Sequence, residues 1–197
     1  YLTLIFILLY APIATLIVLS FNASKTRAKW GGFTLKWYFE LFQNDAILEA
    51  LSNTLIIAFL SALIATVIGT AASIGINAMN RHLKTIFMSV TNIPMLNADI
   101  VTGISLMLLF IAFGVRFGFS TILLAHITFN IPYVILSVMP KLKQIDQNTY
   151  MAALDLGASP FYAFYKVIVP DILPGILSGF LLSFTMSLDD FIITHFT

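Results

Sequence analysis

The sequence has 197 residues, of which 59% are hydrophobic and only 10% are charged, and its mean hydropathy is +0.97. An ordinary soluble domain carries about 25% charged residues, so this chain lacks the polar surface that a water-soluble enzyme needs. The net charge of +1 gives no basic patch for nucleic acid, and the absence of cysteine excludes disulfides, thiol nucleophiles and cysteine–metal sites. The composition therefore favours a polytopic membrane protein.

Five apolar stretches are each long enough to cross a bilayer once, since a spanning helix needs about 20 residues. In lipid each stretch must be helical, because unpaired backbone groups find no water there. The predicted fold class is therefore all-α, a polytopic transmembrane helical bundle. The predicted spans are residues 1–20, 52–78, 86–115, 117–139 and 172–193.

A longer connection, residues 21–49, separates the first two predicted spans. Within it, Phe33, Trp37 and Leu41 fall on one face of a helix predicted over residues 32–42. Trp and Tyr are enriched at membrane–water interfaces, so we expect this short helix to lie in the interface. Trp37 is either an anchor there or a residue of the substrate path that gates it or contacts a binding protein.

Small residues recur at a spacing of four in two predicted spans. They are Ala65, Gly69 and Ser73 in the second span and Gly175 and Gly179 in the last. Such stripes allow helices in membranes to approach closely. They either pack within the bundle of this chain or form a seam with a second subunit, and both interpretations stay open at this stage.

The connection between the fourth and fifth spans contains two predicted short helices with a hinge between them. Asp146 caps the first helix, and Gly157 ends it, since glycine adopts the left-handed conformation without a side-chain clash. Ser159 caps the second helix, and Pro160 occupies its first turn, where a missing N–H is no loss. We expect Pro170 and Pro174 to limit how far this second helix runs before the last span.

The tip of this connection is small and apolar, which suits docking into a groove on a partner protein. The segment resembles the coupling loop of ABC import permeases, in which Glu-Ala-Ala is followed by three residues and Gly, then by nine residues, Ile, one residue and Leu-Pro. Met151 stands in place of the glutamate, and valines replace the isoleucine and leucine. The resemblance implies that residues 140–171 are cytoplasmic and dock on an ATPase subunit. The candidate coupling residues are Met151, Ala152, Ala153, Leu154, Asp155, Gly157, Val167 and Pro170.

Further segments narrow the resemblance, which covers essentially the whole chain. Residues 20–22, 36–38, 97–101, 126–132 and 182–191 look like the C-type permease of spermidine/putrescine importers. This likeness implies the type I ABC importer permease fold with six spans, the sixth lying outside this sequence. It also implies a multi-pass protein of the bacterial inner membrane, with the connection between the first two spans on the external side.

The same resemblance implies the partners. They are a second homologous permease subunit, two cytoplasmic ATPase subunits, an external polyamine-binding protein and membrane lipid. The chain has no Walker-type glycine loop to hold phosphates. We therefore expect no cofactor in this chain, with ATP and Mg bound by the ATPase, and no nucleic-acid partner.

Three acids lie within or beside predicted spans without an embedded Lys or Arg to pair with them: Asp99, Asp189 and Asp190. An acid at the bilayer centre costs roughly 2.5–3.5 kcal/mol, so such residues normally face a cavity or a partner. A kink at Pro94 could expose backbone beside Asp99. Three unpaired acids suit a polyvalent organic cation, to which aromatic faces add attraction. The alternative is that they cap helix ends or contact the second permease.

Two polar residues of the spans have competing interpretations. Ser187 either lines the path beside Asp189 or bonds to the backbone of its own helix. His126 has no second ligand three or four residues away, so we expect an interhelical hydrogen bond and no metal site. Because Asp189 and Asp190 are neighbours, about 100° apart on a helix, they should face different surroundings.

The leading prediction is the permease subunit of an ATP-driven polyamine importer, which is not itself an enzyme. An importer of another solute, such as an iron complex, a phosphonate or another amine, would carry the same coupling segment. An intramembrane aspartyl protease also needs two membrane aspartates, but the Gly-x-Gly-Asp signature is missing. A carrier driven by an ion gradient would leave the coupling segment unexplained.

Overall fold

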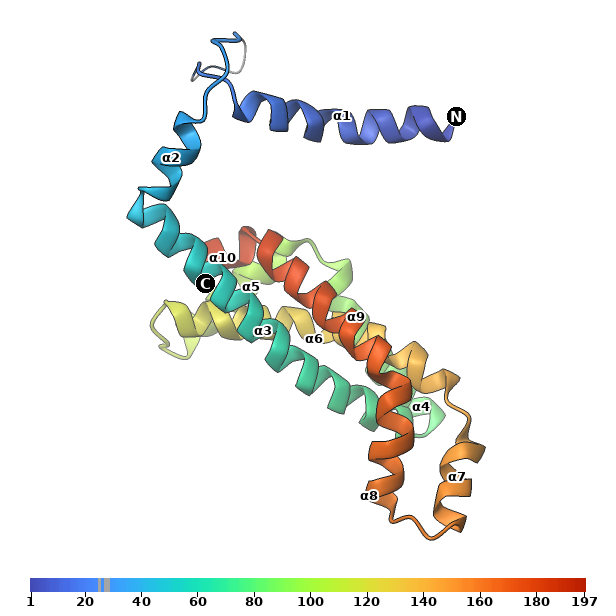
Figure 1. Ribbon diagram of the computed structural model, residues 1–197. Coiled ribbons are helices and arrows are strands. Elements are labelled where there is room, and N and C mark those ends of the chain that lie inside the picture. Colours follow the sequence, from blue (N-terminus) through green and yellow to red (C-terminus); the bar gives the residue numbers. More distant parts are fainter. Residues whose placement is uncertain (25, 27–28) are drawn as a thin grey trace. The chain divides into compact units, whose positions relative to one another are not determined.

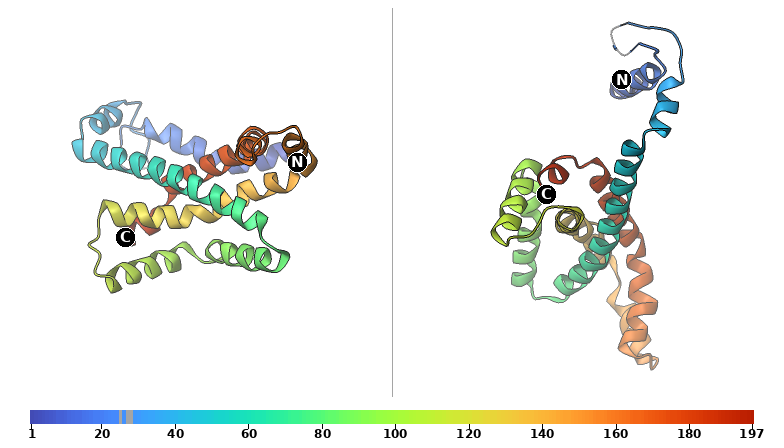
Figure 2. Two further views of the ribbon diagram at one scale, coloured as in Figure 1. Left: turned by 90° about the horizontal axis from the view of Figure 1, so that it is seen from below. Right: turned by 90° about the vertical axis from the view of Figure 1, so that its left-hand side faces the viewer.

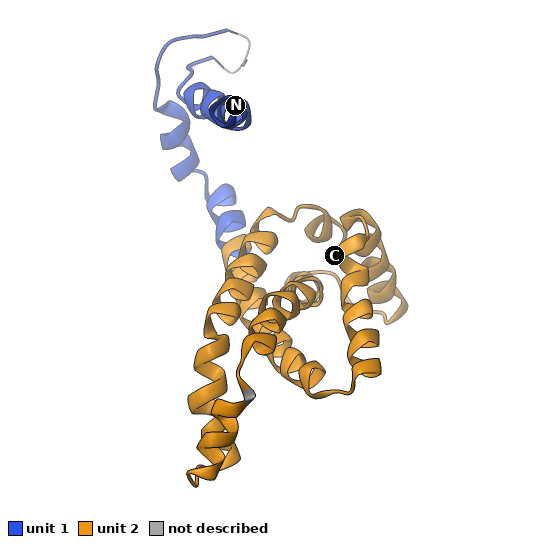
Figure 3. Ribbon diagram, turned by 90° about the vertical axis from the view of Figure 1, so that its right-hand side faces the viewer, with its two compact units in different colours: residues 1–53 blue, residues 54–197 orange. Residues whose placement is uncertain are grey.

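The computed structural model describes residues 1–24, 26 and 29–197. These residues are almost entirely helical, with one isolated antiparallel bridge between Asn22 and Phe33. The predicted all-α class is therefore confirmed. The chain forms two compact units, unit 1 with residues 1–53 and unit 2 with residues 54–197 (Figure 3). The single domain predicted over 1–197 stays a prediction.

Unit 1 contains α1 (Leu2–Ser20), α2 (Lys36–Phe42) and the first turns of α3 (Asp45–Ala78). The helix predicted over residues 32–42 begins later than expected, because the Thr34 hydroxyl accepts a hydrogen bond from the Lys36 N–H and Leu35 is the last residue outside the helix. Of the connecting segment predicted over 21–49, residues 25, 27 and 28 lie outside the described residues.

In unit 2, α6 (Phe119–Gln144) runs through the middle (Figures 1 and 2). On one side lie α3 and α9 (Val169–Asp189), and on the other lie α4 (Arg81–Leu96) and α5 (Asp99–Ala112). Side chains of α3, α6 and α9 form one apolar cluster, whose buried members are Ala65, Val134, Val138, Leu142 and Ile172.

Glycines of α3 and α9 allow these two helices to approach α6 closely. A Cβ placed on Gly69 of α3 would lie 2.7 Å from the Val134 Cβ, closer than real Cβ atoms come. A Cβ on Gly175 would lie 2.9 Å from Cγ of Lys141, and one on Gly179 would lie 3.3 Å from Cα of Val134. The small-residue stripes therefore pack within this chain, which was the first of the two interpretations.

The third predicted span, residues 86–115, consists of two helices. Pro94 lies inside α4, and the break comes after it at Asn97 and Ala98, which are extended with ψ angles of 147° and 139°. Asp99 then occupies the first turn of α5, where its negative charge interacts favourably with the helix N-terminus. The two axes differ by 104°, so the chain turns sharply at Asn97 and Ala98, a few residues beyond Pro94, where we predicted the kink.

Within the described residues, four helices are long and apolar enough to cross a membrane, and α4 with α5 makes a fifth if the pair is one broken span. The four are α1, α3, α6 and the continuous helix from Pro160 to Asp189. The predicted spans overlap these helices, but α3 and α6 extend beyond the predicted limits at one end. The last span, predicted over residues 172–193, belongs to a helix that begins at Pro160 and ends at Asp189, because the backbone at Asp190 is extended.

The predicted caps of the coupling segment are confirmed. The Asp146 carboxylate accepts a hydrogen bond of 2.9 Å from the Asn148 N–H at the start of α7 (Gln147–Asp155). Gly157 follows α7 with a φ of +88°. The Ser159 hydroxyl accepts from the Tyr162 N–H at the start of α8 (Pro160–Ala163).

The prediction that Pro170 and Pro174 limit the second helix before the last span is wrong. Residues 160–189 form one continuous helix of 30 residues, with a π-helical turn, η1 (Phe164–Ile168), just before α9. A proline lacks an N–H and clashes with the carbonyl four residues earlier, here that of Lys166. The wider π turn contains Lys166 and so relieves the clash.

Candidate functional site

Polar side chains from four helices, all buried except that of Thr194, meet where α9 gives way to α10 (Ile192–Phe196). The chain turns there because Asp190 is extended, with ψ of 107°, and α10 packs back through the fully buried Ile193 onto Phe110 and Phe129. We call this group the polar cluster. Its members are Ser61, His126, Asn130, Ser187, Asp190 and Thr194.

His126 is the centre of the polar cluster and is 2% exposed. Its Nδ1 lies 2.6 Å from Oγ of Ser187, and its Nε2 lies 3.0 Å from Oγ1 of Thr194. The Thr194 hydroxyl donates to the Asp190 carbonyl at 3.1 Å, so it accepts from a protonated Nε2. Nδ1 then accepts from Ser187. The predicted interhelical hydrogen bond of His126 is confirmed.

The hydrogen bonds continue from Ser187 to α3 and back to α6. Oγ of Ser187 lies 3.1 Å from Oγ of Ser61, and Nδ2 of Asn130 donates to Ser61 at 3.4 Å. Ser187 therefore bonds to two other helices, an arrangement that neither of its predicted alternatives described. Its place in a substrate path stays a prediction.

One carboxylate oxygen of Asp190 accepts a hydrogen bond from a described residue, and the other does not. Oδ1 accepts a hydrogen bond of 3.2 Å from the Ile193 N–H. Oδ2 lies 3.6 Å from Nε2 of His126 and makes no hydrogen bond to a described residue, although the side chain is only 8% exposed. Among the described residues no Lys or Arg pairs with Asp190, as we predicted, but His126 lies beside it, and residue spacing did not indicate this proximity.

The other two acids differ from Asp190. Asp99 is exposed in the first turn of α5, and its charge acts on both Asp190 and Tyr133. Asp189 is exposed at the end of α9. The structure therefore brings Asp99 towards Asp190, and the two adjacent acids face different surroundings, as predicted.

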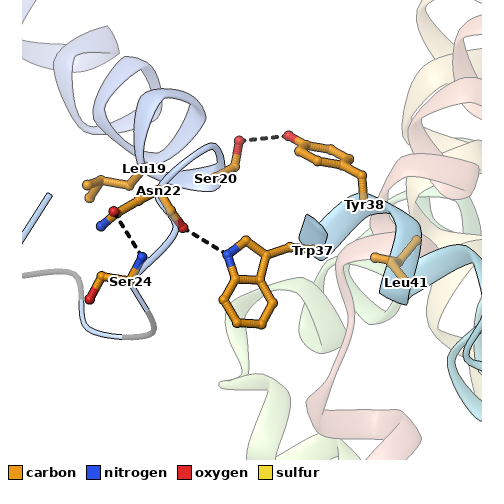
Figure 4. Close-up of a pocket in the computed structure, with 7 residues that line it drawn as sticks. All are labelled: Leu19, Ser20, Asn22, Ser24, Trp37, Tyr38 and Leu41. Atoms are coloured by element: carbon orange, nitrogen blue, oxygen red, sulfur yellow. Dashed lines mark hydrogen bonds between the residues drawn. The ribbon is translucent and has the colours of Figure 1, made fainter. Parts of the chain in front are cut away.

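Trp37 belongs to unit 1 and holds α2 to the turn after α1 (Figure 4). Its indole N–H donates to the Asn22 carbonyl at 2.8 Å, and the Tyr38 hydroxyl lies 2.7 Å from Oγ of Ser20. These side chains help to line a cavity of about 450 Å³. Two segments that carried the family resemblance, residues 20–22 and 36–38, are therefore in contact.

The coupling residues lie on an accessible segment that projects from unit 2 (Figure 1). Met151 is 59% exposed and lines a cavity of about 300 Å³. The other lining residues are Asn77, Leu142, Ile145, Tyr150 and Ile168. In residues 1–24, 26 and 29–197, no group of three His, Asp or Glu side chains could hold a metal ion.

Comparison with known proteins identifies the family. Residues 65–197 match the family described as binding-protein-dependent transport system inner membrane component. The chain belongs to this family. It is therefore a multi-pass transport subunit of the bacterial inner membrane and not an enzyme, which removes the aspartyl protease alternative. Its family supplies the membrane components of ABC importers.

Similar proteins include polyamine permeases. The spermidine/putrescine transport system permease protein PotC of Escherichia coli K12 is 40% identical over 196 residues, which are 100% of this chain and 74% of PotC. The putrescine transport system permease protein PotI of the same strain is 39% identical over 97% of this chain and 70% of PotI. A PotC homolog of Mycoplasma pneumoniae is 30% identical over 97% of this chain and 71% of its own length.

Sequence reasoning singled out His126, Ser187 and Asp190 of the polar cluster in this inner membrane component, but it missed Ser61, Asn130 and Thr194. Ser61 lies four residues before the Ala65 stripe, and Ser187 lies eight residues after Gly179. Asn130 likewise follows His126 by four residues. Extending these spacings of four would therefore have found Ser61 and Asn130 as well as Ser187. Thr194 gave no such signal, because the turn at Asp190 alone brings it to His126.

Proposed function

We propose that the chain is a permease subunit of an ATP-driven ABC importer that moves spermidine or putrescine across the membrane. The carboxylate of Asp190 carries this proposal, because one of its oxygens is buried without a hydrogen bond in the described structure. The charge of Asp99 acts on the same carboxylate. The names of the relatives with 40% and 39% identity point to the same substrates.

An ammonium group that leaves water needs replacement partners, and a carboxylate is the strongest that a protein offers. Asp99 and Asp190, on separate helices, suit a substrate with more than one ammonium group. In this proposal Asp189 and Ser187 belong to the same path, and the part of Trp37 in transport stays a prediction.

The proposal includes the partners that this chain needs. A second permease completes the path, an external binding protein delivers the amine, and two cytoplasmic ATPase subunits bind the ATP and Mg. The accessible α7 and α8 dock on an ATPase through Ala152, Ala153, Leu154 and their neighbours. This chain itself needs no cofactor.

The test is uptake of labelled spermidine and putrescine into vesicles that contain the purified complex and its binding protein. We expect uptake that requires ATP and is competed by unlabelled polyamine. A phosphonate and an iron complex serve as comparison solutes. If one of them is taken up and neither polyamine is, the chain serves an importer of another solute.

A further inference from the structure

We propose that His126 is a positioning residue that sets the Asp190 carboxylate for a cationic substrate and thereby determines the apparent affinity of transport. This inference rests on the proposed function. In this proposal His126 makes no contact with the substrate and acts only through Asp190. Its starting point is the 3.6 Å approach of Nε2 to Oδ2, the one Asp190 oxygen without a hydrogen bond among the described residues.

The position of His126 is fixed from both ring nitrogens. Ser187 holds Nδ1 at 2.6 Å, and Thr194 holds Nε2 at 3.0 Å. With so little exposure and two short hydrogen bonds, the ring has one orientation, and its Nε2–H edge is directed towards Thr194 and Asp190. A ring held in this way limits where the nearby carboxylate oxygen can lie.

Asp190 needs such a neighbour because its own segment fixes only one of its two carboxylate oxygens. Oδ1 is tied to the Ile193 N–H, but the backbone at Asp190 is extended between two helices. The Thr194 hydroxyl bonds to the Asp190 carbonyl while it accepts from His126. His126 therefore affects Asp190 in two ways. Its Nε2 lies beside Oδ2 of the carboxylate, and its hydrogen bond to Thr194 supports the hydroxyl that bonds to the Asp190 carbonyl.

A buried carboxylate oxygen without a hydrogen bond is costly unless a partner arrives. A hydrogen bond from His126 straight to Oδ2 would compete with an incoming ammonium. At 3.6 Å the imidazole supports the carboxylate without satisfying it. Oδ2 is thus oriented and left available, which favours binding of a cation from the path.

Three substitutions of His126 separate positioning from packing. The amide of Gln reaches about as far as Nε2, and the amide of Asn about as far as Nδ1. We expect His126→Ala and His126→Asn to raise KM for spermidine uptake about tenfold, equal to about 1.4 kcal/mol, with a smaller change in the maximal rate. His126→Gln should restore KM to a large extent, because it replaces the group beside Asp190.

The measurement is the uptake kinetics of the complete complex with its ATPase and binding protein. The matched control is Thr128→Val on the same helix, since Thr128 is exposed and its hydroxyl bonds only to the Leu124 carbonyl among the contacts of the described residues. Thr194→Val should raise KM in the same direction, and its effect should not add to that of His126→Ala. This second site keeps the test decisive if the His126→Ala complex fails to assemble.

An unchanged KM in assembled His126 variants would overturn the inference, as would rescue by Asn in preference to Gln. A fall in the maximal rate at constant KM would show that His126 serves only folding or movement. An unmodified complex that transports neither amine would overturn the proposed function, and this inference with it. An unmodified complex that transports polyamines while the variants match it overturns the inference alone.

Discussion

The two ends of the α3–α6–α9 bundle have the same geometry and opposite chemistry. Each helix carries a row of buried residues at a spacing of four along the face that it turns to the other two. Towards the coupling segment the rows are small or apolar, and towards α10 they are polar. The small or apolar rows are Ala65, Gly69 and Ser73 in α3, Val134, Val138 and Leu142 in α6, and Gly175 and Gly179 in α9. Their polar continuations towards α10 are Ser61, His126 with Asn130, and Ser183 with Ser187.

The difference shows how one packing pattern serves two purposes. In the apolar half, contact is made by shape, because Gly69 and Gly179 both pack closely against Val134. In the polar half, contact is made by directional hydrogen bonds, and acceptor oxygens of Asn130 and Asp190 are left without one in the described part of the chain. We infer that the apolar half fixes the bundle and the polar half is available for a ligand.

The largest effect should come from removing the charge of the polar half. We expect Asp190→Asn to weaken spermidine transport by about 10- to 150-fold in KM, since a hydrogen bond to a charged group contributes about 1.5–3 kcal/mol. Asp189→Asn should have a smaller effect, because Asp189 is exposed. Uptake kinetics measure both, with co-purification of the subunits as the check on assembly. Equal effects of the two variants would contradict the different roles assigned to them.

A single added methyl group should destabilise the packing of the apolar half. Gly69→Ala places a Cβ 2.7 Å from that of Val134, and such overpacking costs about 1–3 kcal/mol. Gly75→Ala is the matched control on the same helix, since its Cβ would meet nothing within 4 Å. Thermal unfolding of the purified complex should show a loss for Gly69→Ala and no loss for Gly75→Ala. The same loss in both would show that the close approach to Val134 is unimportant.

The coupling segment beyond the apolar half depends on one backbone conformation. Gly157 has a φ of +88°, so Gly157→Val should cost on the order of 1–2 kcal/mol and weaken docking of the ATPase. Gly157→Asn is the control, because Asn tolerates this region better than a β-branched residue. Co-purification and ATP-driven uptake are the measurements. Normal docking of the Val variant would count against the role of this turn.

The smallest effect on stability should come from Met151→Glu, which restores the family's usual residue. Met151 is exposed, so the free energy of unfolding should change by less than about 0.5 kcal/mol. We expect the number of ATP molecules hydrolysed per transported amine to change, since the new charge faces the docking partner. An identical ratio in both forms would show that methionine at this position is neutral.

Local signals predicted the coupling segment well. Asp146, Gly157 and Ser159 act through atoms of their nearest neighbours in sequence, so their roles follow from residue type and spacing. The same reasoning failed at Pro170, because it treated proline as a stop. Whether a proline ends a helix depends on the turn before it, and here a π turn accommodates it.

The candidate site was predicted only in part. Membrane acids were found because a charge in an apolar stretch stands out, and Asp99 and Asp190 do lie within electrostatic reach of each other. The neighbour of Asp190 was missed, since His126 lies 64 positions away in the sequence and no pairing rule joins them. Trp37 was recognised by its type, but its hydrogen bond to Asn22 depends on the path of the chain between them.

The sequence by itself determined the helical class, the approximate spans and the caps of the coupling segment, because hydropathy and capping act over one or two helical turns. Only the tertiary structure decided that the small-residue stripes close on α6, that the chain turns by 104° before Asp99, and that His126 meets Asp190. These features depend on which helix faces which. Many helices of similar hydropathy could be neighbours in a membrane, and close packing and buried hydrogen bonds select among them.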